Sequence, residues 1–416
     1  MMVEPNSLTA LRPDSFRPDA ESSDAGHARS FEETWDLLEP LLPRVPVTRV
    51  YDTTPLDYIS SPVWSAVTPL AEDLMVSAGK GATPIAAKLS AVMEAIERVS
   101  AEKLPAHRIV RGSYADLAAS GAVDPEDFNL PLDTAYRPDA VFSWTGAYDL
   151  ARGGHHLVPA DLVLNPAAEG MTARIETNGL ASGNTYSEAV LHAVCELVER
   201  DAVSEEAFYS AHHDPLFSPR RPLRVMSPES VPAGAAKDLL DALTGQGLVV
   251  RIQDLTNVVG VPVVRVVLFD DGYFGQEGKV TYFPGYGADL RPERALLRAL
   301  TEACQGHASF ATGAREVFET GRARRRPAEM KRIDSLYRNP GSLVFPRAED
   351  AGGSILENLR TIVGRLRDAG HDRCLVTELT RADLGVPVVR VLVPGLASPY
   401  GQSSRTPTLR LLESVI

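Results

Sequence analysis

The sequence is poor in cysteine and contains no long hydrophobic run. Its 416 residues include three cysteines, Cys195, Cys304 and Cys374. They are too few and too dispersed for a disulfide framework or a CxxC zinc clip. No segment approaches the roughly 20 apolar residues of a membrane-spanning helix, and the N-terminus shows no basic region followed by an apolar run. We therefore expect a cytoplasmic protein that does not contact a membrane.

Positive charge is also in short supply. There are 42 Lys and Arg residues against 55 Asp and Glu residues, which gives a net charge of −13. This charge opposes nonspecific attraction to nucleic acid, so we expect no nucleic-acid partner. The length allows about two to three domains or one elaborated α/β domain.

Three regions follow one another along the chain. Residues 1–30 mix Pro, Ser, Asp and Ala without periodicity, which predicts a flexible N-terminal tail. The segment "SFEETWDLLEPLLPRV" begins with a capping-box pattern at Ser30 and carries apolar residues at helical spacing, so it predicts a helix. We assign residues 31–397 to one folded domain and residues 398–416 to a C-terminal tail.

Internal repeats indicate the architecture. "VRIQDLTNVVGVPVVRVVLFD" from Val250 and "LVTELTRADLGVPVVRVLVPG" from Leu375 are near copies, and "RVYDTTPLDYISSPVWSAV" from Arg49 is a looser third copy. Each copy is typical of a pair of strands, in which Pro marks a strand start or an edge because it cannot donate to a ladder.

Three helical segments also repeat one polar pattern. The spacing i, i+4, i+7 is shared by Ser90, Glu94 and Glu97, by His192, Glu196 and Glu199, and by Arg298, Glu302 and Gln305. At 3.6 residues per turn these positions form one stripe along each helix, opposite an apolar face. The sequence therefore predicts an α/β fold built from related strand-strand-helix units, packed so that their polar stripes converge.

The acidic stripes have two interpretations. Isolated Glu at helical spacing usually marks a solvated helix face. Here, however, two helices each present a carboxylate pair at i, i+3, and each pair is followed at once by an arginine, Arg98 or Arg200. A converged set of carboxylates needs a cation, and oxygen ligands without His/Cys spacing favour Mg²⁺ over zinc. Because protein-bound Mg²⁺ usually carries substrate phosphates, the pattern indicates a nucleotide site.

Short glycine-containing segments precede both acidic helices. "SAGKG", residues 77–81, offers close backbone approach and Lys80 for a phosphate. Without the neighbouring acidic residues, a plain turn with a surface lysine would be the better interpretation. The Walker A spacing is absent, so a P-loop NTPase is disfavoured. "SGNT", residues 182–185, provides an N-cap through Asn184 or Thr185, a role compatible with ligand binding.

With these segments the sequence resembles the YcaO family. "SAGKG", "SAVMEAIER", "GLASGNTYSEAVLHAVCELVERDA", "RALLRALTEACQ" and "VPVVRVLVPGL" occur in the family's order between about Arg49 and Leu396. The resemblance implies a YcaO-like fold with helices that line a nucleotide site, and the cofactors ATP and Mg²⁺. It also implies phosphorylation of a peptide backbone amide oxygen, followed by its replacement to give an azoline, an amidine or a thioamide.

The resemblance also implies roles for individual residues. It places Glu94, Glu97, Glu196 and Glu199 at the metal. It assigns nucleotide contacts to Lys80, Ser90, Asn184, Glu188 and Arg200. Arg200 and Arg315, the latter in "TGARE", would act on phosphate or substrate. Such a site suits phosphoryl transfer, which needs positioning and charge neutralisation more than a protein nucleophile.

Two segments bear on the product and the partners. The chain ends "SPYGQSSRTPTLRLLESVI", whereas azoline-forming members commonly end in a Pro-rich tail. The segment "SFEETWDLLEPLLPRVPVTRVYDTTPLD" is similar to YcaO proteins that act with TfuA in thioamidation. We therefore favour a thioamide over an azoline or amidine. We expect a peptide substrate, a TfuA-like or leader-binding partner protein, and a homodimer.

Other functions remain open at this point. A degenerate, nucleotide-free scaffold or substrate carrier has no need of repulsive acids, which argues against it. A small-molecule kinase would use the same site on a hydroxyl group. His192 on the second stripe is either a general base or a histidine hydrogen-bonded to a neighbouring Glu, and the second is our interpretation.

Overall fold

A computed structural model describes residues 4–16, 26–172, 177–214, 216, 219–270, 282–312, 327–347, 353–398 and 405–415. The strands are β1 (Arg49–Asp52), β2 (Val63–Val67), β3 (Val76–Lys80), β4 (Val110–Gly112), β5 (Phe142–Asp149), β6 (His155–Pro159), β7 (Leu180–Ser182), β8 (Val225–Met226), β9 (Val249–Asp254), β10 (Val263–Phe269), β11 (Tyr282–Ala288), β12 (Leu375–Glu378) and β13 (Val388–Leu392). The helices are α1 (Phe31–Leu38), α2 (Pro84–Ala101), α3 (Tyr114–Leu117), α4 (Ala160–Val163), α5 (Tyr186–His212), α6 (Ala235–Gly245), α7 (Pro292–Ala311), α9 (Pro327–Arg338), α10 (Ile355–Asp368) and α11 (Leu409–Glu413).

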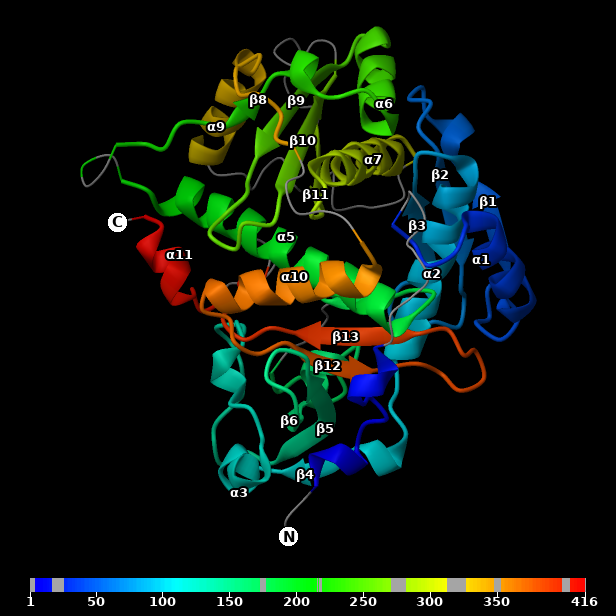
Figure 1. Ribbon diagram of the computed structural model, residues 1–416, viewed down its shortest axis with the longest axis vertical. Helices are drawn as coiled ribbons and strands as arrows, with labels where there is room; N and C mark the ends of the chain where they lie inside the picture. Colours follow the sequence, from blue (N-terminus) through cyan, green and yellow to red (C-terminus); the bar gives the residue numbers. More distant parts are fainter. Residues whose placement is uncertain are drawn as a thin grey trace.

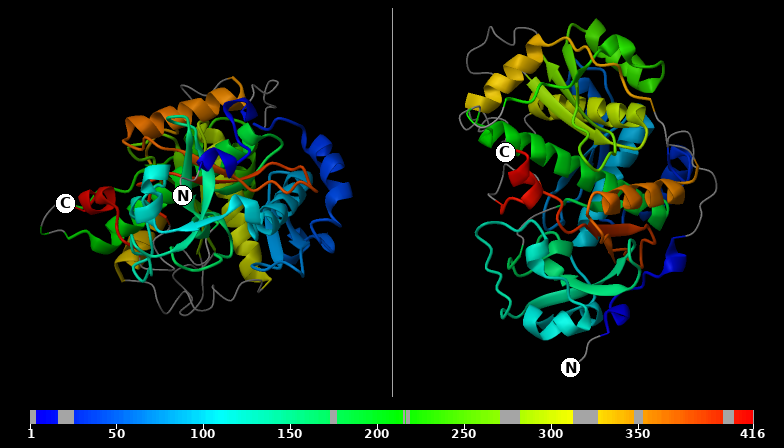
Figure 2. Two further views of the ribbon diagram at one scale, coloured as in Figure 1. Left: turned by 90° about the horizontal axis from the view of Figure 1, so that it is seen from below. Right: turned by 60° about the vertical axis from the view of Figure 1, so that its left-hand side comes forward.

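The described strands form three antiparallel sheets. Their orders are β1-β2-β3, β11-β10-β9-β8 and β4-β5-β12-β13-β7, with β6 paired to β5. Helices α5 and α10 cross the middle of the molecule between the four-stranded and six-stranded sheets, and α1 and α2 lie with the three-stranded sheet at one side (Figure 1). The right-hand view of Figure 2 shows the same order of layers. The predicted α/β class is therefore confirmed.

The three sequence repeats form the expected hairpins, β1–β2, β9–β10 and β12–β13. Each hairpin gains a third strand that leads into a helix: β3 before α2, β11 before α7, and β7 before α5. The third unit is permuted, since β7 and α5 precede β12 and β13 in the chain. The repeated element is thus three strands and a helix, one strand more than the sequence predicted.

Glycine allows each helix to approach its third strand closely. A Cβ at Gly79 in β3 would lie 2.1 Å from the Ala87 carbonyl oxygen of α2, and one at Gly285 in β11 would lie 2.1 Å from the Ala299 carbonyl oxygen of α7. Both contacts are to helix backbone, which cannot rotate away. These glycines therefore determine how near the polar stripes come to the strands.

The helix starts follow local rules. Ser30 and Glu33 form the predicted capping box of α1, because the Glu33 amide donates to Ser30 Oγ at 3.1 Å and the Ser30 amide donates to Glu33 Oε2 at 2.9 Å. Thr83 caps α2 and Thr185 caps α5, each through its side chain. The N-cap of α7 is Arg291, which makes no side-chain cap bond.

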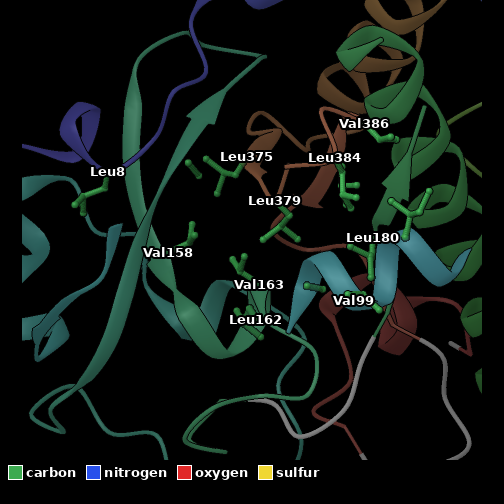
Figure 3. Close-up of a cluster of buried hydrophobic side chains, with 14 of the residues drawn as sticks. Leu8, Val99, Val158, Leu162, Val163, Leu180, Leu375, Leu379, Leu384 and Val386 are labelled. Carbon is green, nitrogen blue, oxygen red and sulfur yellow. The ribbon is translucent and has the colours of Figure 1, made fainter. Parts of the chain in front are cut away.

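The flexible tail predicted for residues 1–30 is wrong for residues 4–16. Leu8 is buried in the same apolar cluster as Val158 and Leu375 (Figure 3), and Leu11 and Phe16 are buried in a second cluster. The Leu8 carbonyl also accepts a hydrogen bond from Arg108 Nε at 3.0 Å. Widely spaced apolar residues anchor this segment although its overall composition is polar and rich in turn formers.

The C-terminal residues 405–415 pack against α5. Leu411 of α11 is buried with Phe208 of α5, and Arg410 donates to the fully buried carboxylate of Asp201. Asp201 also accepts from the Ala397 amide at 2.9 Å. Within the described part of the chain, no helix has the length and apolar character needed to cross a bilayer.

Candidate active site

The site begins at β3, where "SAGKG" contributes an extended strand. Residues 77–80 lie in β3, so the alternative of a plain turn is excluded. Gly79 serves the close contact with α2 described above, and Lys80 at the strand end pairs with Glu302 of α7. Gln305, one turn further along α7, donates from Nε2 to the Ala78 carbonyl at 2.5 Å. The third stripe, on α7, therefore faces β3, the strand that precedes α2 and the first stripe.

The first and second stripes meet where β7 enters α5. Glu97 Oε1 on α2 accepts hydrogen bonds from the Ser182 amide at 2.8 Å and from Ser182 Oγ at 2.6 Å. One turn away, Glu94 Oε1 accepts from Arg98 Nη2 at 2.8 Å, and Arg98 Nη1 also contacts Asp73 Oδ2 at 2.5 Å. Arg98 is therefore an anchor for Glu94 and for the loop after β2.

Arg200 is the cation of the second stripe. Its Nε lies 3.7 Å from Glu196 Oε1 and 3.8 Å from Glu199 Oε1. Burial alone would lower the pKa of Arg200, but Glu199, Glu196 and Glu302 outweigh it and raise that pKa. About a third of the Arg200 side chain stays exposed, with a relative accessibility of 32%. Arg200 is therefore a charged group that can still reach a ligand.

Three carboxyl groups of the first two stripes have raised pKa values. Burial raises the pKa of Glu97 to about 8, and the neighbouring Glu94 and Glu196 add to the rise. Burial, together with repulsion from Glu302, raises the pKa of Glu199 to about 7. The pKa of Glu196 is raised as well, mainly by burial. These shifts mark carboxylates that gain from an added cation.

Glu302 of the third stripe behaves differently. Burial raises its pKa, but the charges of Lys80 and Arg200 outweigh burial and lower that pKa below the ordinary value. Glu302 is thus an ionised group whose charge is already neutralised by the protein.

These residues suit Mg²⁺ together with a phosphate ligand. In the described part of the chain, no three His, Cys, Asp or Glu side chains lie close enough to hold a metal by themselves. Oxygen donors, among them carboxyl groups whose pKa values are raised, match the way Mg²⁺ binds, through one or two carboxylates plus phosphates. Of the four predicted ligands, Glu196 and Glu199 lie beside Arg200, Glu97 is held by Ser182, and Glu94 is held by Arg98.

The other predicted site residues fall into two groups. Asn184 and Glu188, at the start of α5, bond to each other and to residues 27–34, with Asn184 Nδ2 3.3 Å from Glu188 Oε1. Ser90 is half-buried on α2, one turn before Glu94. Arg315 lies outside the described residues.

His192 does not bond to a neighbouring Glu as interpreted from the sequence. It hydrogen-bonds the Ser182 backbone, and the charge of Arg298, followed by burial, lowers the pKa of His192 well below its ordinary value. It is therefore a neutral imidazole. A pocket between α5, α7 and α10 extends from it, lined among others by His27, Glu188, His192, Arg294, Arg298 and Asn358.

Sequence reasoning placed the third stripe correctly but left its residues out of the site. Glu302 and Arg298 share the spacing of the other two stripes, so that repeat was the available signal. Ser182 lies in the "SGNT" segment, but no sequence signal predicts its contact with Glu97 or that of His27 with Glu188, because these contacts join distant parts of the chain.

The family model described as YcaO cyclodehydratase, ATP- and Mg²⁺-binding, matches residues 78–397. The chain belongs to the YcaO family. The expected cofactors of this YcaO protein, ATP and Mg²⁺, are thereby confirmed, and ATP-dependent modification of a peptide is supported as its general activity.

Similar proteins and solved structures agree with this family assignment. An uncharacterized protein of Methanothermobacter thermautotrophicus is 37% identical over 88% of this chain and 93% of its own length. An uncharacterized protein encoded in the tfuA 3′ region of Rhizobium leguminosarum bv. trifolii is 32% identical over 94% and 93%. YcaO from Methanopyrus kandleri, bound with AMPPCP and Mg²⁺, is 27% identical with a TM-score of 0.70, over 89% of this chain and 92% of that one. A heterocyclase in complex with substrate and cofactor shares the fold at 23% identity and a TM-score of 0.73, over 95% of this chain and 56% of that longer one.

Proposed function

We propose that this YcaO protein uses Mg²⁺-ATP to phosphorylate a backbone amide oxygen of a ribosomally made peptide or protein, and that the product is a thioamide. The observation that carries the proposal is the group of carboxyls at Glu97, Glu196 and Glu199 beside Arg200, buried or half-buried, whose pKa values are raised mainly by burial. A scaffold has no use for such a group, because it costs stability when the site is empty.

The side chains of the site would divide the work. Glu196 and Glu199, with Glu94 and Glu97 behind them, would hold Mg²⁺, which neutralises the phosphate charge that develops during transfer. Arg200, beside Glu196 and Glu199, and Lys80, which pairs with Glu302, would position the phosphates. Asn184 and Glu188 would take the nucleoside end, with Ser90 nearby, and Arg315 would contact phosphate or substrate.

The reaction needs no protein nucleophile. The amide oxygen attacks the γ-phosphorus and ADP leaves with the bonding electrons. Hydrosulfide then adds to the activated carbon, and inorganic phosphate departs with the original amide oxygen and the hydrosulfide proton. Peptide amide, ATP and hydrosulfide thus give thioamide, ADP and hydrogen phosphate. A Cys, Ser or Thr side chain or an amine in place of hydrosulfide would give an azoline or an amidine.

One relative supports our choice of a thioamide. The Rhizobium relative is named for its place beside tfuA, and it matches nearly the whole of this chain. This supports a TfuA-like partner protein that works with the YcaO chain in thioamidation. We propose a homodimer as the working form.

Calorimetric titration of Mg²⁺-ATP tests the nucleotide site directly. We expect the wild type to bind and Glu199→Gln to lose binding by roughly 100-fold or more, because the variant removes a charge that faces the Mg²⁺-phosphate group. Glu229→Gln, a matched change at an exposed glutamate, should bind as the wild type does. Equal binding by Glu199→Gln would contradict the assignment of the site.

The product is tested in the source organism. Peptides from cells that carry the wild type and cells that carry Glu199→Gln are compared by mass spectrometry. Oxygen-to-sulfur exchange that is lost in the variant supports thioamidation. Loss of water that depends on the wild type would identify an azoline or an amidine, and a phosphorylated small molecule would identify a kinase.

A further inference from the structure

The carboxylate of Glu188 is almost fully engaged by a segment from outside the repeats. Its Oε1 accepts from His27 Nδ1 at 2.8 Å and from Asn184 Nδ2 at 3.3 Å, and its Oε2 accepts from the Ala28 amide at 3.1 Å. Together these donors outweigh the effect of burial and lower the pKa of Glu188. A carboxylate has about four acceptor positions, so little capacity remains for another ligand.

Asn184 is engaged from the same side. Its Oδ1 accepts from Thr34 Oγ1 on α1 at 3.0 Å, and Arg29 Nη1 reaches the Asn184 carbonyl at 3.3 Å. Residues 27–34 therefore cover both side chains at the start of α5.

The same segment also reaches α7. Gly26 has φ +83°, and a Cβ at this position would lie 2.3 Å from Arg294 Nη1. Gly26, His27, Glu188 and Arg294 all line the pocket between α5, α7 and α10. The segment thus spans from one wall of the pocket to the other, and the capping box at Ser30 fixes its C-terminal end.

We propose that residues 26–30 form an intramolecular latch that occupies Glu188 and Asn184, and that Mg²⁺-ATP must displace it to use these side chains. This rests on the proposed function, which assigns both residues to the nucleoside end of the site. Nucleotide hydroxyl groups and the His27 and Ala28 donors compete for the same acceptor oxygens. The apparent nucleotide affinity is therefore the intrinsic affinity multiplied by the fraction of molecules in which the latch is open.

The latch is tested by nucleotide binding to His27→Ala. This change removes one charge-assisted contact with Glu188, and we expect Mg²⁺-ATP to bind roughly tenfold more tightly in calorimetry. His107→Ala, at an exposed histidine, should match the wild type. Thermal melting verifies that each variant is folded. If His27→Ala does not fold, Thr34→Val is titrated in its place, because it removes the shorter of the two hydrogen bonds to Asn184 Oδ1 and leaves the one from Arg29.

Hydrogen exchange provides a second readout on the intact wild type. Saturating Mg²⁺-ATP should accelerate exchange at the Ala28 amide, since that amide leaves Glu188 Oε2 when the latch opens. If the wild type binds, unchanged binding by His27→Ala overturns the latch, and weaker binding overturns it and makes His27 part of the site. A wild type that binds no nucleotide overturns the proposed site and the latch together.

Discussion

The units that end in α2 and α7 share their packing and differ in their charge. Gly79 in β3 and Gly285 in β11 each lie against the backbone of the helix that follows. The stripe that results is Ser90, Glu94 and Glu97 on α2 but Arg298, Glu302 and Gln305 on α7. Burial raises the pKa of Glu97, whereas Lys80 and Arg200 outweigh burial and lower the pKa of Glu302.

The difference shows that one scaffold can carry opposite electrostatic roles. The contact between glycine and helix backbone fixes where the stripe lies. The residues on and around the stripe decide whether its carboxylates still need a cation or are already neutralised by the protein. In this YcaO protein α2 and α5 supply carboxylates that need a cation, while α7 supplies Glu302 to hold Lys80 in place.

The largest expected effect separates the two kinds of carboxylate. Glu196→Gln should reduce Mg²⁺-dependent ADP release by roughly 100-fold or more, because it removes a charge that Mg²⁺ requires. Glu302→Gln should cost clearly less, since Lys80 already neutralises that carboxylate. ADP release is measured at saturating Mg²⁺-ATP with both variants shown to be folded. Equal losses of ADP release in the two variants would show that Glu196 and Glu302 do not have different roles.

The shared packing predicts similar losses of stability in both units. Gly79→Ala and Gly285→Ala should each lower the free energy of unfolding by about 1–3 kcal/mol, because the new Cβ would press on helix backbone. Gly364→Ala on α10 is the matched control, since a Cβ there meets nothing within 4 Å and should stabilise the helix slightly. Denaturant unfolding measures all three. If Gly285→Ala left the free energy of unfolding unchanged, α7 would not pack against its strand as closely as α2 does.

The pH dependence of stability should show the same contrast. The folded-state pKa of Glu97 is about 8, above its ordinary value of 4.5, so the folded state holds this proton more tightly than the unfolded state. Its contribution to stability is complete below about pH 4.5 and is lost as pH rises through 8. In Mg²⁺-free buffer the melting temperature should therefore fall between pH 6 and 9.

Two substitutions check the origin of that fall. Glu97→Gln should make the fall shallower, because an amide has no proton to lose, while Glu199, whose pKa is raised to about 7, keeps part of the fall in place. Glu302→Gln should keep the contribution of Glu97 and shift that of Glu199 to lower pH, since it removes the repulsion that raises the pKa of Glu199. A wild-type melting temperature that is constant over this range would argue against a buried, protonated Glu97.

The smallest expected effect concerns the helix starts. Thr83→Ala and Thr185→Ala should each cost about 1 kcal/mol of unfolding free energy, because each threonine caps its helix. Arg291→Ala should change little, as Arg291 provides no side-chain cap for α7. Equal costs at all three positions, measured by denaturant unfolding, would show that the caps do not distinguish the units.

The sequence predicted the hairpins and stripes because both have strict local periods. It did not predict β3 and β11 as third strands. "VSAGK" and "YFPGYGA" contain Gly or Pro, which normally weaken strands, and here Gly79 and Gly285 are needed where a helix lies against the strand. Only the packing of the folded protein explains these glycines.

The candidate site was predictable where its residues repeat. The four glutamates on α2 and α5 and Arg200 follow from spacing and the resemblance. The contacts of Glu188 with His27 and of Glu97 with Ser182 join segments far apart in sequence, so no local pattern reveals them. The buried places of Leu8 and Leu11 were missed for the same reason.

The permuted third unit has a consequence for biosynthesis. β7, which leads into α5, pairs with β13, with Ser182 opposite Val388. During translation α5 therefore emerges long before the strands that complete its sheet, and its apolar face must wait for them. The helix that carries Glu196, Glu199 and Arg200 can reach its final place only after β12 and β13 have left the ribosome. Nascent chains that stop short of β13 should therefore carry no assembled nucleotide site.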